Sequence, residues 1–383
     1  MHTSTIPIVH PEALHSITGD DLLALAGFAD EQAQAVSFYF SLSSSPDNSH
    51  REEVLMVQQL VRDIAATPQT EGGISKDLSA IVMAAEEFRH VPSRLNAVFA
   101  CHDRHIWQVF DLPVSGSISR LEVGRHFHLE PLLQALESCA PYCVVIIEHG
   151  KARAFVVHGS DIQEIIGRFK AEDLSAHPDN ARVGWSHHIA GNERDRARAY
   201  FKELSWEIHR FMEHHKCSRL VIGCRDGLWS ELEPQFLSSE KTAVIGRFHT
   251  ANFDVAPHEV LQAIKPIIEG NLQRRYEDLL NKINEGSARS AIGLDQVVDN
   301  LEQGRVQKLL LGKRSNEMIS ECGQCGHLHA GLGVQCVFCG SKTHAVLAEE
   351  ALIRRALVTE AEILLPGPDT SYGHDDVAAL LRY

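Results

Sequence analysis

The sequence lacks the features of an exported or membrane-spanning chain. Residues 1–7 contain no basic segment that leads into an apolar run, and no later stretch is apolar over the length that a bilayer requires. We therefore expect a cytoplasmic protein that makes no membrane contact. Five of its nine cysteines are scattered among apolar neighbours, as the reduced thiols of a protein core are: Cys101, Cys139, Cys143, Cys217 and Cys224.

A surplus of positive charge is also missing. The 36 Lys and Arg are outnumbered by 51 Asp and Glu, which gives a formal net charge of -15. Because phosphate neutralisation needs clustered cations, this charge argues against a protein that coats nucleic acid without specificity. We expect no DNA partner, and any RNA contact must be local. The 23 histidines are dispersed, which favours ordinary surface and packing roles.

Apolar residues are numerous enough for more than one folded domain. The length of 383 residues and the hydrophobic content of 44% predict two or three domains, each with its own core. Helical and strand periodicities alternate, which predicts a mixed α/β, multidomain fold class. We expect strands at 35–40, 97–101, 106–110, 143–147, 154–157, 220–223, 243–246, 306–311 and 362–365, and helices at 52–66, 257–285, 294–303 and 347–357.

Two Cys-x-x-Cys pairs lie close together near the end of the chain, and each is followed by a glycine. Cys322, Cys325, Cys336 and Cys339 supply the four soft ligands that tetrahedral zinc requires. A lone pair of this kind is also typical of a redox site, and two disulfides or four core thiols are further interpretations. We expect a zinc ribbon at 320–342 that is structural, because four thiolates leave no open position for water.

A second candidate site is a basic stretch in the middle of the chain. Residues 168–190 contain several helix breakers and are predicted to form a long loop, and Asn192 is a suitable N-cap for the helix that follows. From Arg182 to Arg225 there are nine Lys and Arg but only five Asp and Glu. A solvated helix face with i,i+4 ion pairs is one interpretation. The adjoining loop favours the other interpretation, which is a local RNA contact.

The last third of the chain resembles a known family. Residues 297–311, the inserted ribbon and the ending at 377–383 are similar to domain three of the archaeal and eukaryotic class-one peptide-chain release factors and of Pelota. Residues 143–159 resemble the opening hairpin of that family's RNase H-like second domain. Residues 97–110 and 123–133 are similar to the first domain of bacterial members of this superfamily.

This resemblance implies three domains and two partners. The domains are an N-terminal α/β domain at 1–140, an RNase H-like middle domain at 141–268, and a C-terminal domain at 269–383. In the family, the last of these is related to proteins that bind kink-turn RNA. The implied partners are the ribosome, through its rRNA, and a translational GTPase.

The chain departs from release factors at their functional motifs. Release factors carry Gly-Gly-Gln before a basic helix, and only Gly191 of that tripeptide survives at the corresponding place. Asn-Ile-Lys-Ser and Tyr-x-Cys-x-x-x-Phe, which the family associates with stop-codon reading, are both absent. In release factors the Gln orients water at the peptidyl-tRNA ester, and Asn192 or Glu193 would differ from it in reach or charge.

We therefore expect a ribosome-associated factor that acts in ribosome rescue or dormancy and is not an enzyme. Two alternatives stay open. One is a peptidyl-tRNA ester hydrolase in which Asn192 or Glu193 orients water, and the other is a protein-interaction module outside translation, which the acidic charge would suit. The residues expected to contact ribosomal RNA are Trp185, His187, His188, Gly191, Asn192, Glu193, Arg194, Arg196, Arg198 and Lys202.

Overall fold

The structure is a computed structural model in which the chain forms two compact units. Met1–Glu137 and Gln273–Tyr383 make the first unit, and Ser138–Leu272 makes the second. Both units contain helices and sheets, so the predicted mixed α/β class is confirmed, while the division into three domains stays a prediction. No described helix is both long and apolar enough to cross a bilayer. The described residues are 17–30, 34–41, 50–66, 73–87, 94–113, 118–148, 151–159, 161–165, 186–250, 252–285, 289–312, 317–333, 335–365 and 377–383.

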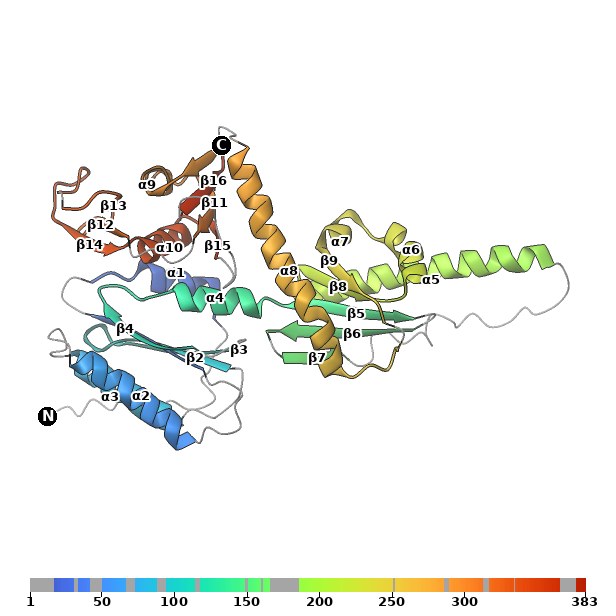
Figure 1. Cartoon of the computed structure of the whole chain (residues 1–383), viewed down its shortest axis with the longest axis horizontal. Helices are drawn as coiled ribbons and strands as arrows, with labels where there is room; N and C mark the ends of the chain where they lie inside the picture. The colour runs from blue at the N-terminus through green and yellow to red at the C-terminus, as the bar shows by residue number, and fades with distance from the viewer. Residues whose placement is uncertain are drawn as a thin grey trace. The chain divides into compact units, whose positions relative to one another are not determined.

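An antiparallel sheet with the strand order β3-β2-β1-β4 forms the N-terminal part of the first unit (Figure 1). Alternate residues of β1 point to opposite faces, and Val36 and Phe38 pack in one core with Ile81 of α3. On the other face, the ring of Tyr39 meets that of Phe99 edge-on at 5.7 Å. The elements are α1 (Gly19–Gly27), β1 (Ala35–Ser41), α2 (His50–Ala65), α3 (Gly73–Glu87), β2 (Arg94–Cys101), β3 (Ile106–Pro113), β4 (Ser119–Gly124) and α4 (Glu130–Cys139).

Two further sheets form the C-terminal part of the first unit. The larger has the order β10-β16-β11-β15, and the smaller has the order β13-β12-β14. Gly304 follows α9 with a positive φ of 66°, so the predicted helix stop at this glycine is confirmed. The elements are the part of α8 (Pro257–Asn284) from Gln273 onward, its earlier residues belonging to the second unit, followed by β10 (Ser290–Ile292), α9 (Leu294–Glu302), β11 (Val306–Leu311), β12 (Met318–Cys322), β13 (Leu328–His329), β14 (Thr343–Leu347), α10 (Ala348–Val358), β15 (Glu362–Leu364) and β16 (Val377–Leu381).

The second unit is built on a mixed sheet with the order β7-β6-β5-β8-β9. Strands β5 and β6 form the antiparallel hairpin that the sequence predicts, and β7 continues it. Strands β8 and β9 add to β5 in parallel. The description of this unit as RNase H-like stays a prediction. The elements are β5 (Tyr142–Glu148), β6 (Lys151–His158), β7 (Asp161–Ile165), α5 (Ser186–His214), β8 (Arg219–Gly223), α6 (Asp226–Leu232), α7 (Ser238–Ala243) and β9 (Val244–Phe248).

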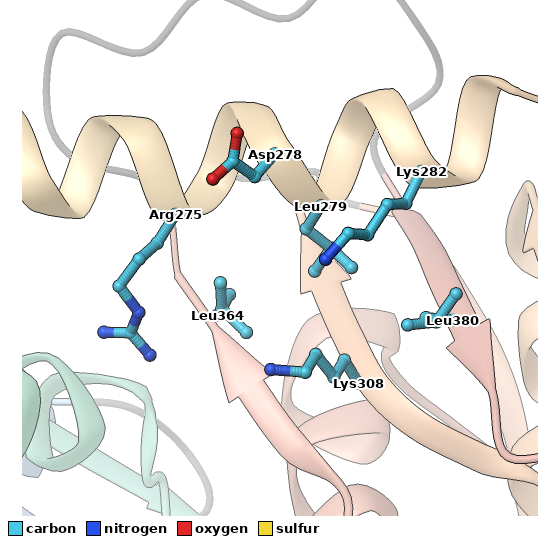
Figure 2. Close-up of a pocket in the computed structure, with 7 residues that line it drawn as sticks. All are labelled: Arg275, Asp278, Leu279, Lys282, Lys308, Leu364 and Leu380. Carbon is cyan, nitrogen blue, oxygen red and sulfur yellow. The ribbon is translucent and has the colours of Figure 1, made fainter. Parts of the chain in front are cut away.

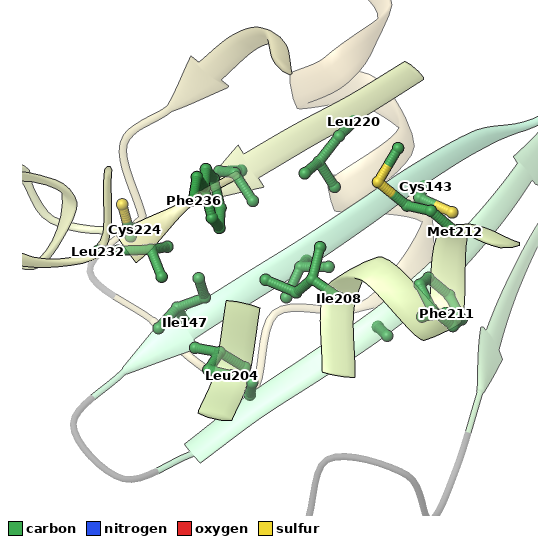
Figure 3. Close-up of a cluster of buried hydrophobic side chains, with 14 of the residues drawn as sticks. Cys143, Ile147, Leu204, Ile208, Phe211, Met212, Leu220, Cys224, Leu232 and Phe236 are labelled. Atoms are coloured by element: carbon green, nitrogen blue, oxygen red, sulfur yellow. The ribbon is translucent and has the colours of Figure 1, made fainter. Parts of the chain in front are cut away.

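Helix α5 packs on this sheet through one apolar face. Leu204, Ile208 and Phe211 recur at helical spacing and lie in one buried cluster with Cys143 and Ile147 of β5 (Figure 3). The continuous apolar run of β5 is explained by its position in the middle of the sheet, where both faces of the strand are buried.

The start of α5 differs from the sequence-based expectation. The helix begins at Ser186, so the prediction that a loop extends to residue 190 and that Asn192 is the N-cap is wrong. Gly191 and Asn192 inside a helix cost about 1 kcal/mol or less each relative to Ala. The Arg, Ala and Glu residues that follow them are strong helix formers, and they continue the helix through both positions. The rest of the expected loop, residues 168–185, lies outside the described residues.

A buried carboxylate joins the two sequence segments of the first unit. Glu350 of α10 is only 7% exposed, and it accepts hydrogen bonds from the backbone N–H groups of Leu129 and Glu130 at 3.0 and 3.2 Å. These N–H groups stand at the start of α4 and have no partner inside that helix. The carboxylate therefore caps the positive end of α4. The imidazole Nδ1 of His128 lies 2.7 Å from the same carboxylate.

The surroundings of Glu350 lower the pKa of its carboxyl group. Burial alone would raise the pKa, but the hydrogen bonds from His128 and from the backbone of Leu129 and Glu130 outweigh burial and hold the pKa below its usual value. A carboxyl group whose pKa is lowered on folding stabilises the fold above its unfolded pKa of about 4.3. This stabilisation is lost as the pH falls through the lower, folded pKa.

We predict that Glu350→Gln lowers the free energy of unfolding by about 2 kcal/mol at pH 7, because it removes a buried charge that accepts several hydrogen bonds. Urea unfolding measures the loss. The gap between the two proteins should shrink as the pH falls below about 4.3 and through the lower pKa of the folded state, because the wild-type carboxyl then becomes protonated in both states. The control Glu285→Gln, at an exposed position after α8, should change stability by less than about 0.5 kcal/mol. A gap that does not change with pH would contradict this account.

Candidate functional site

The outer side of α5 carries cations around an exposed tryptophan. Arg198, Lys202, Trp206 and Arg210 are spaced four residues apart, so they follow one another along one side of the helix. All four side chains are exposed, and that of Trp206 is 54% exposed. We call these four residues the α5 stripe.

Among the side chains that the structure describes, one ion pair of the kind expected on a solvated helix face involves the α5 stripe. Arg210 pairs with Glu207 at 3.2 Å. Neither Arg198 nor Lys202 forms an ion pair with a residue that the structure describes. Exposed cations beside an exposed indole match the way proteins hold single-stranded RNA, with cations on phosphates and aromatic rings on bases.

Only part of the predicted RNA-binding set is described. Arg198 and Lys202 lie on the exposed side of α5, and Trp185 falls outside the described residues. Sequence reasoning missed Trp206, although its spacing of four residues from both Lys202 and Arg210 is the signal that identifies it. The remaining predicted residues have helical backbone in the first turns of α5, and their side chains are not described: His187, His188, Gly191, Asn192, Glu193, Arg194 and Arg196.

The four predicted metal ligands come together beside the smaller C-terminal sheet. Their sulfur atoms all lie within 4.8 Å of one another. The Sγ atoms of Cys322 and Cys339 are 3.4 Å apart, and those of Cys325 and Cys336 are 3.6 Å apart. Two sulfurs that bind one tetrahedral zinc at about 2.3 Å lie about 3.8 Å apart. The cluster therefore has the size of such a site.

Two similar turns, each ending in a glycine, bring these thiols together. The N–H of Gly326 donates to the carbonyl of Cys322 at 3.0 Å, and the N–H of Gly340 donates to that of Cys336 at 2.8 Å. Both glycines have a positive φ, 68° and 72°, which a residue with a side chain rarely adopts. The expected glycine at the end of each Cys-x-x-Cys turn is confirmed.

The donor set fits a metal ion. The four sulfur atoms lie close enough to bind one ion. Because thiolates are soft ligands, the four cysteines could bind an ion that prefers sulfur. Hydrogen bonds involving the Ser341 side chain and backbone lower the pKa of Cys339, which favours its thiolate. Within the described ranges, no second cluster of His, Cys, Asp or Glu has the geometry of a metal site.

A pocket between α8 and the larger C-terminal sheet is lined by charged groups, two of which are held in ion pairs. Figure 2 shows Arg275 and Lys282 of α8 on one side and Lys308 of β11 on the other. Arg275 and Lys308 both pair with Glu362, at 3.1 and 2.5 Å. The volume of about 170 Å³ is below the roughly 300–1,000 Å³ of most ligand sites. We therefore interpret these ion pairs as ties between α8 and the sheet.

Comparisons with known proteins give one family and several structures. Residues 128–269 match the family described as bacterial archaeo-eukaryotic release factor family 10. No protein of curated function matches the sequence. Pelota from Archaeoglobus fulgidus is 16% identical, with 96% of this chain and 92% of that chain covered and a TM-score of 0.34. Dom34 from S. cerevisiae is 12% identical, with 95% and 93% covered and a TM-score of 0.39.

An archaeal translation termination factor, aRF1, is 13% identical, with 96% of this chain and 99% of that chain covered and a TM-score of 0.24. TM-scores of this size support no argument about the arrangement or activity of the chain. The family match covers residues 128–269, which include α4, the whole sheet of the second unit and the α5 stripe. The predicted resemblance is confirmed on this segment, where the chain is similar to the bacterial archaeo-eukaryotic release factors.

Proposed function

We propose that the protein is a release-factor-like translation factor that binds the ribosome in rescue or dormancy and does not release peptide. The family match over residues 128–269 carries this proposal. The α5 stripe lies inside the matched segment and offers Arg198 and Lys202 to phosphates and Trp206 to a base. Because the net charge is -15, RNA contact is limited to a local surface of this kind.

The backbone at Gly191 supports binding over ester hydrolysis. Gly191, Asn192 and Glu193 lie beyond the first four residues of α5. The N–H groups of such residues bond inside the helix and are not available to surround an ester.

The alternative, a peptidyl-tRNA ester hydrolase, is tested with purified ribosomes that carry peptidyl-tRNA. A hydrolase would release peptide and lose this activity in Asn192→Ala or Glu193→Ala, whereas we expect no release above background.

Two partners follow from the sequence resemblance, and we propose both for this chain. They are the ribosome, contacted through rRNA, and a translational GTPase. Among the similar proteins, one archaeal Pelota is described as ribosome-bound. Dom34 is described as a termination-like factor that interacts with Hbs1.

We also propose that the metal of the cysteine cluster is zinc and that its role is structural. Zinc is the ion most often held by four cysteines with two such turns. Cys322, Cys325, Cys336 and Cys339 would hold it and leave no ligand position for water or substrate. In this proposal the ion ties together a segment whose sheet has only three short strands.

We predict that the double substitution Arg198→Glu with Lys202→Glu abolishes most ribosome binding in sucrose-gradient co-sedimentation at modest salt. Loss of two phosphate contacts should also flatten the dependence of log Kd on log salt by about 1 to 2. The control is Lys241→Glu with Lys265→Glu, which reverses two exposed lysines of the same unit and should bind nearly as the wild type does. If both double variants lose ribosome binding equally, a specific role for the α5 stripe is contradicted. If the wild type is absent from every ribosomal fraction, with and without stress, the proposed function is excluded.

We predict about one zinc ion per chain by elemental analysis, and almost none in Cys325→Ser. In that variant the backbone amides of Gly326 and Gly340 should exchange with solvent at least about 100-fold faster, because metal binding supplies folding free energy. The control Cys217→Ala changes a buried thiol of the other unit and should keep its zinc. A metal-free wild type with the same exchange protection would contradict a structural zinc site.

A further inference from the structure

The ribbon presents apolar side chains that its own fold leaves uncovered. Val337 and Phe338, between the last two cysteines, are each 79% exposed. Met318 and Leu347, paired across β12 and β14, are exposed as well. Isolated exposed apolar residues are ordinary, but a concentration of them marks an interaction site. Of the fourteen large apolar side chains that are exposed in the described residues, Val337 and Phe338 have the largest exposed fractions and are neighbours in the chain, and we call these two the ribbon surface.

The exposed ring of Phe338 rests on a histidine side chain that is itself held by an ion pair. The imidazole of His327 lies against it, with the ring centroids 4.8 Å apart and the planes tilted by 35°. His327 is itself fixed, because its Nδ1 lies 2.6 Å from the buried carboxylate of Glu302. Arg355 pairs with both oxygens of that carboxylate. Support on one side reduces the conformational entropy that such a ring loses when a partner covers it.

The charges around the ribbon surface do not suit RNA. Residues 322–344 contain one lysine, Lys342, and no Asp or Glu. The nearby Arg354 and Arg355 are already paired, with Glu321 and Glu302. Surfaces that bind RNA combine aromatic rings with clustered cations. The centre of a protein–protein interface is instead poor in charge and often contains an aromatic anchor, which Phe338 would supply here.

We infer that the ribbon surface binds a protein of the ribosomal complex and inserts Phe338 and Val337 into an apolar pocket of that protein. The inference rests on the proposed function, since it takes the ribosome as the place of binding. It assigns two kinds of contact to two parts of the chain. The α5 stripe contacts RNA, and the ribbon surface contacts protein with Phe338 as the aromatic anchor.

The test uses the full-length, zinc-containing chain with a photoreactive phenylalanine analogue in place of Phe338, bound to purified ribosomes. The expected result is cross-linking to one ribosomal protein, with little to rRNA. The same analogue in place of Val358, which is exposed at the end of α10, is the control and should not label that protein. Cross-links mainly to rRNA, cross-links to a second copy of the chain, or no cross-links from position 338 would each overturn the inference.

An affinity series separates this inference from the proposed function. Phe338→Ser should weaken ribosome binding about tenfold or more, and Phe338→Trp, which keeps a large ring, should retain most of the affinity. Val358→Ser should bind as the wild type does, and an unchanged zinc content shows that each variant keeps the ribbon folded. If Phe338→Ser binds as tightly as the wild type, the inference fails and the proposed function stands. If the wild type does not bind ribosomes, both fail.

Discussion

The contact of Glu350 with the start of α4 is the interaction on which the first unit depends. That unit consists of two segments, and 135 residues of the second unit separate them in the chain. Since the connection between the segments is so long, chain continuity brings them together only weakly. Contacts must do so instead, and hydrogen bonds from the backbone to a charged group are among the stronger kinds. A second tie lies where the chain leaves and returns, as Arg275 of α8 pairs with Glu137 of α4 at 2.7 Å.

Other buried charged groups also connect the two segments of the first unit, and they lie next to the ribbon. Glu321 of β12 lies 2.8 Å from both His126 and Arg354. Burial lowers the pKa of Arg354, and the charges of Glu321 and Glu350 oppose that effect. Charged groups in such a place add little net stability over apolar ones, because their desolvation is costly. They do fix geometry, since each carboxylate has few positions in which all its donors are satisfied. These ion pairs therefore orient β12. The last residue of β12, Cys322, is the first cysteine of the metal cluster.

Local patterns predicted many of the elements, and long-range contacts explain other features that the sequence did not reveal. The apolar run at 143–147 and the helix that stops at Gly304 are local signals, and both elements form where the residues indicate. The cysteine turns were predictable for the same reason, because each needs only four residues and a glycine. Glu350 was not, because its partners at 129 and 130 lie more than two hundred residues away. A carboxylate in a helical stretch looks like a surface group until the fold buries it.

Trp206 shows a second limit of sequence reasoning. Its neighbours Leu204, Ile208 and Phe211 belong to the apolar face of α5, so a tryptophan among them is easily assigned to the core. The helical phase decides otherwise, because position 206 follows 198 and 202 along the solvent side. The early start of α5 was equally hidden, since Gly191 and Asn192 are poor helix residues individually. The helix continues through them because propensity adds up over the whole segment.

The two proposed surfaces would act together because they respond differently to salt. An acidic chain gains little from long-range attraction to RNA, so the few cations of the α5 stripe must act at short range. Such contacts weaken steeply as salt rises, since each releases counterions. An apolar anchor such as Phe338 does not depend on counterion release. Binding through both surfaces at once would make the second contact intramolecular and raise the total affinity above that of either alone. The anchor would then hold the factor on the ribosome at salt concentrations where a few phosphate contacts alone would release it.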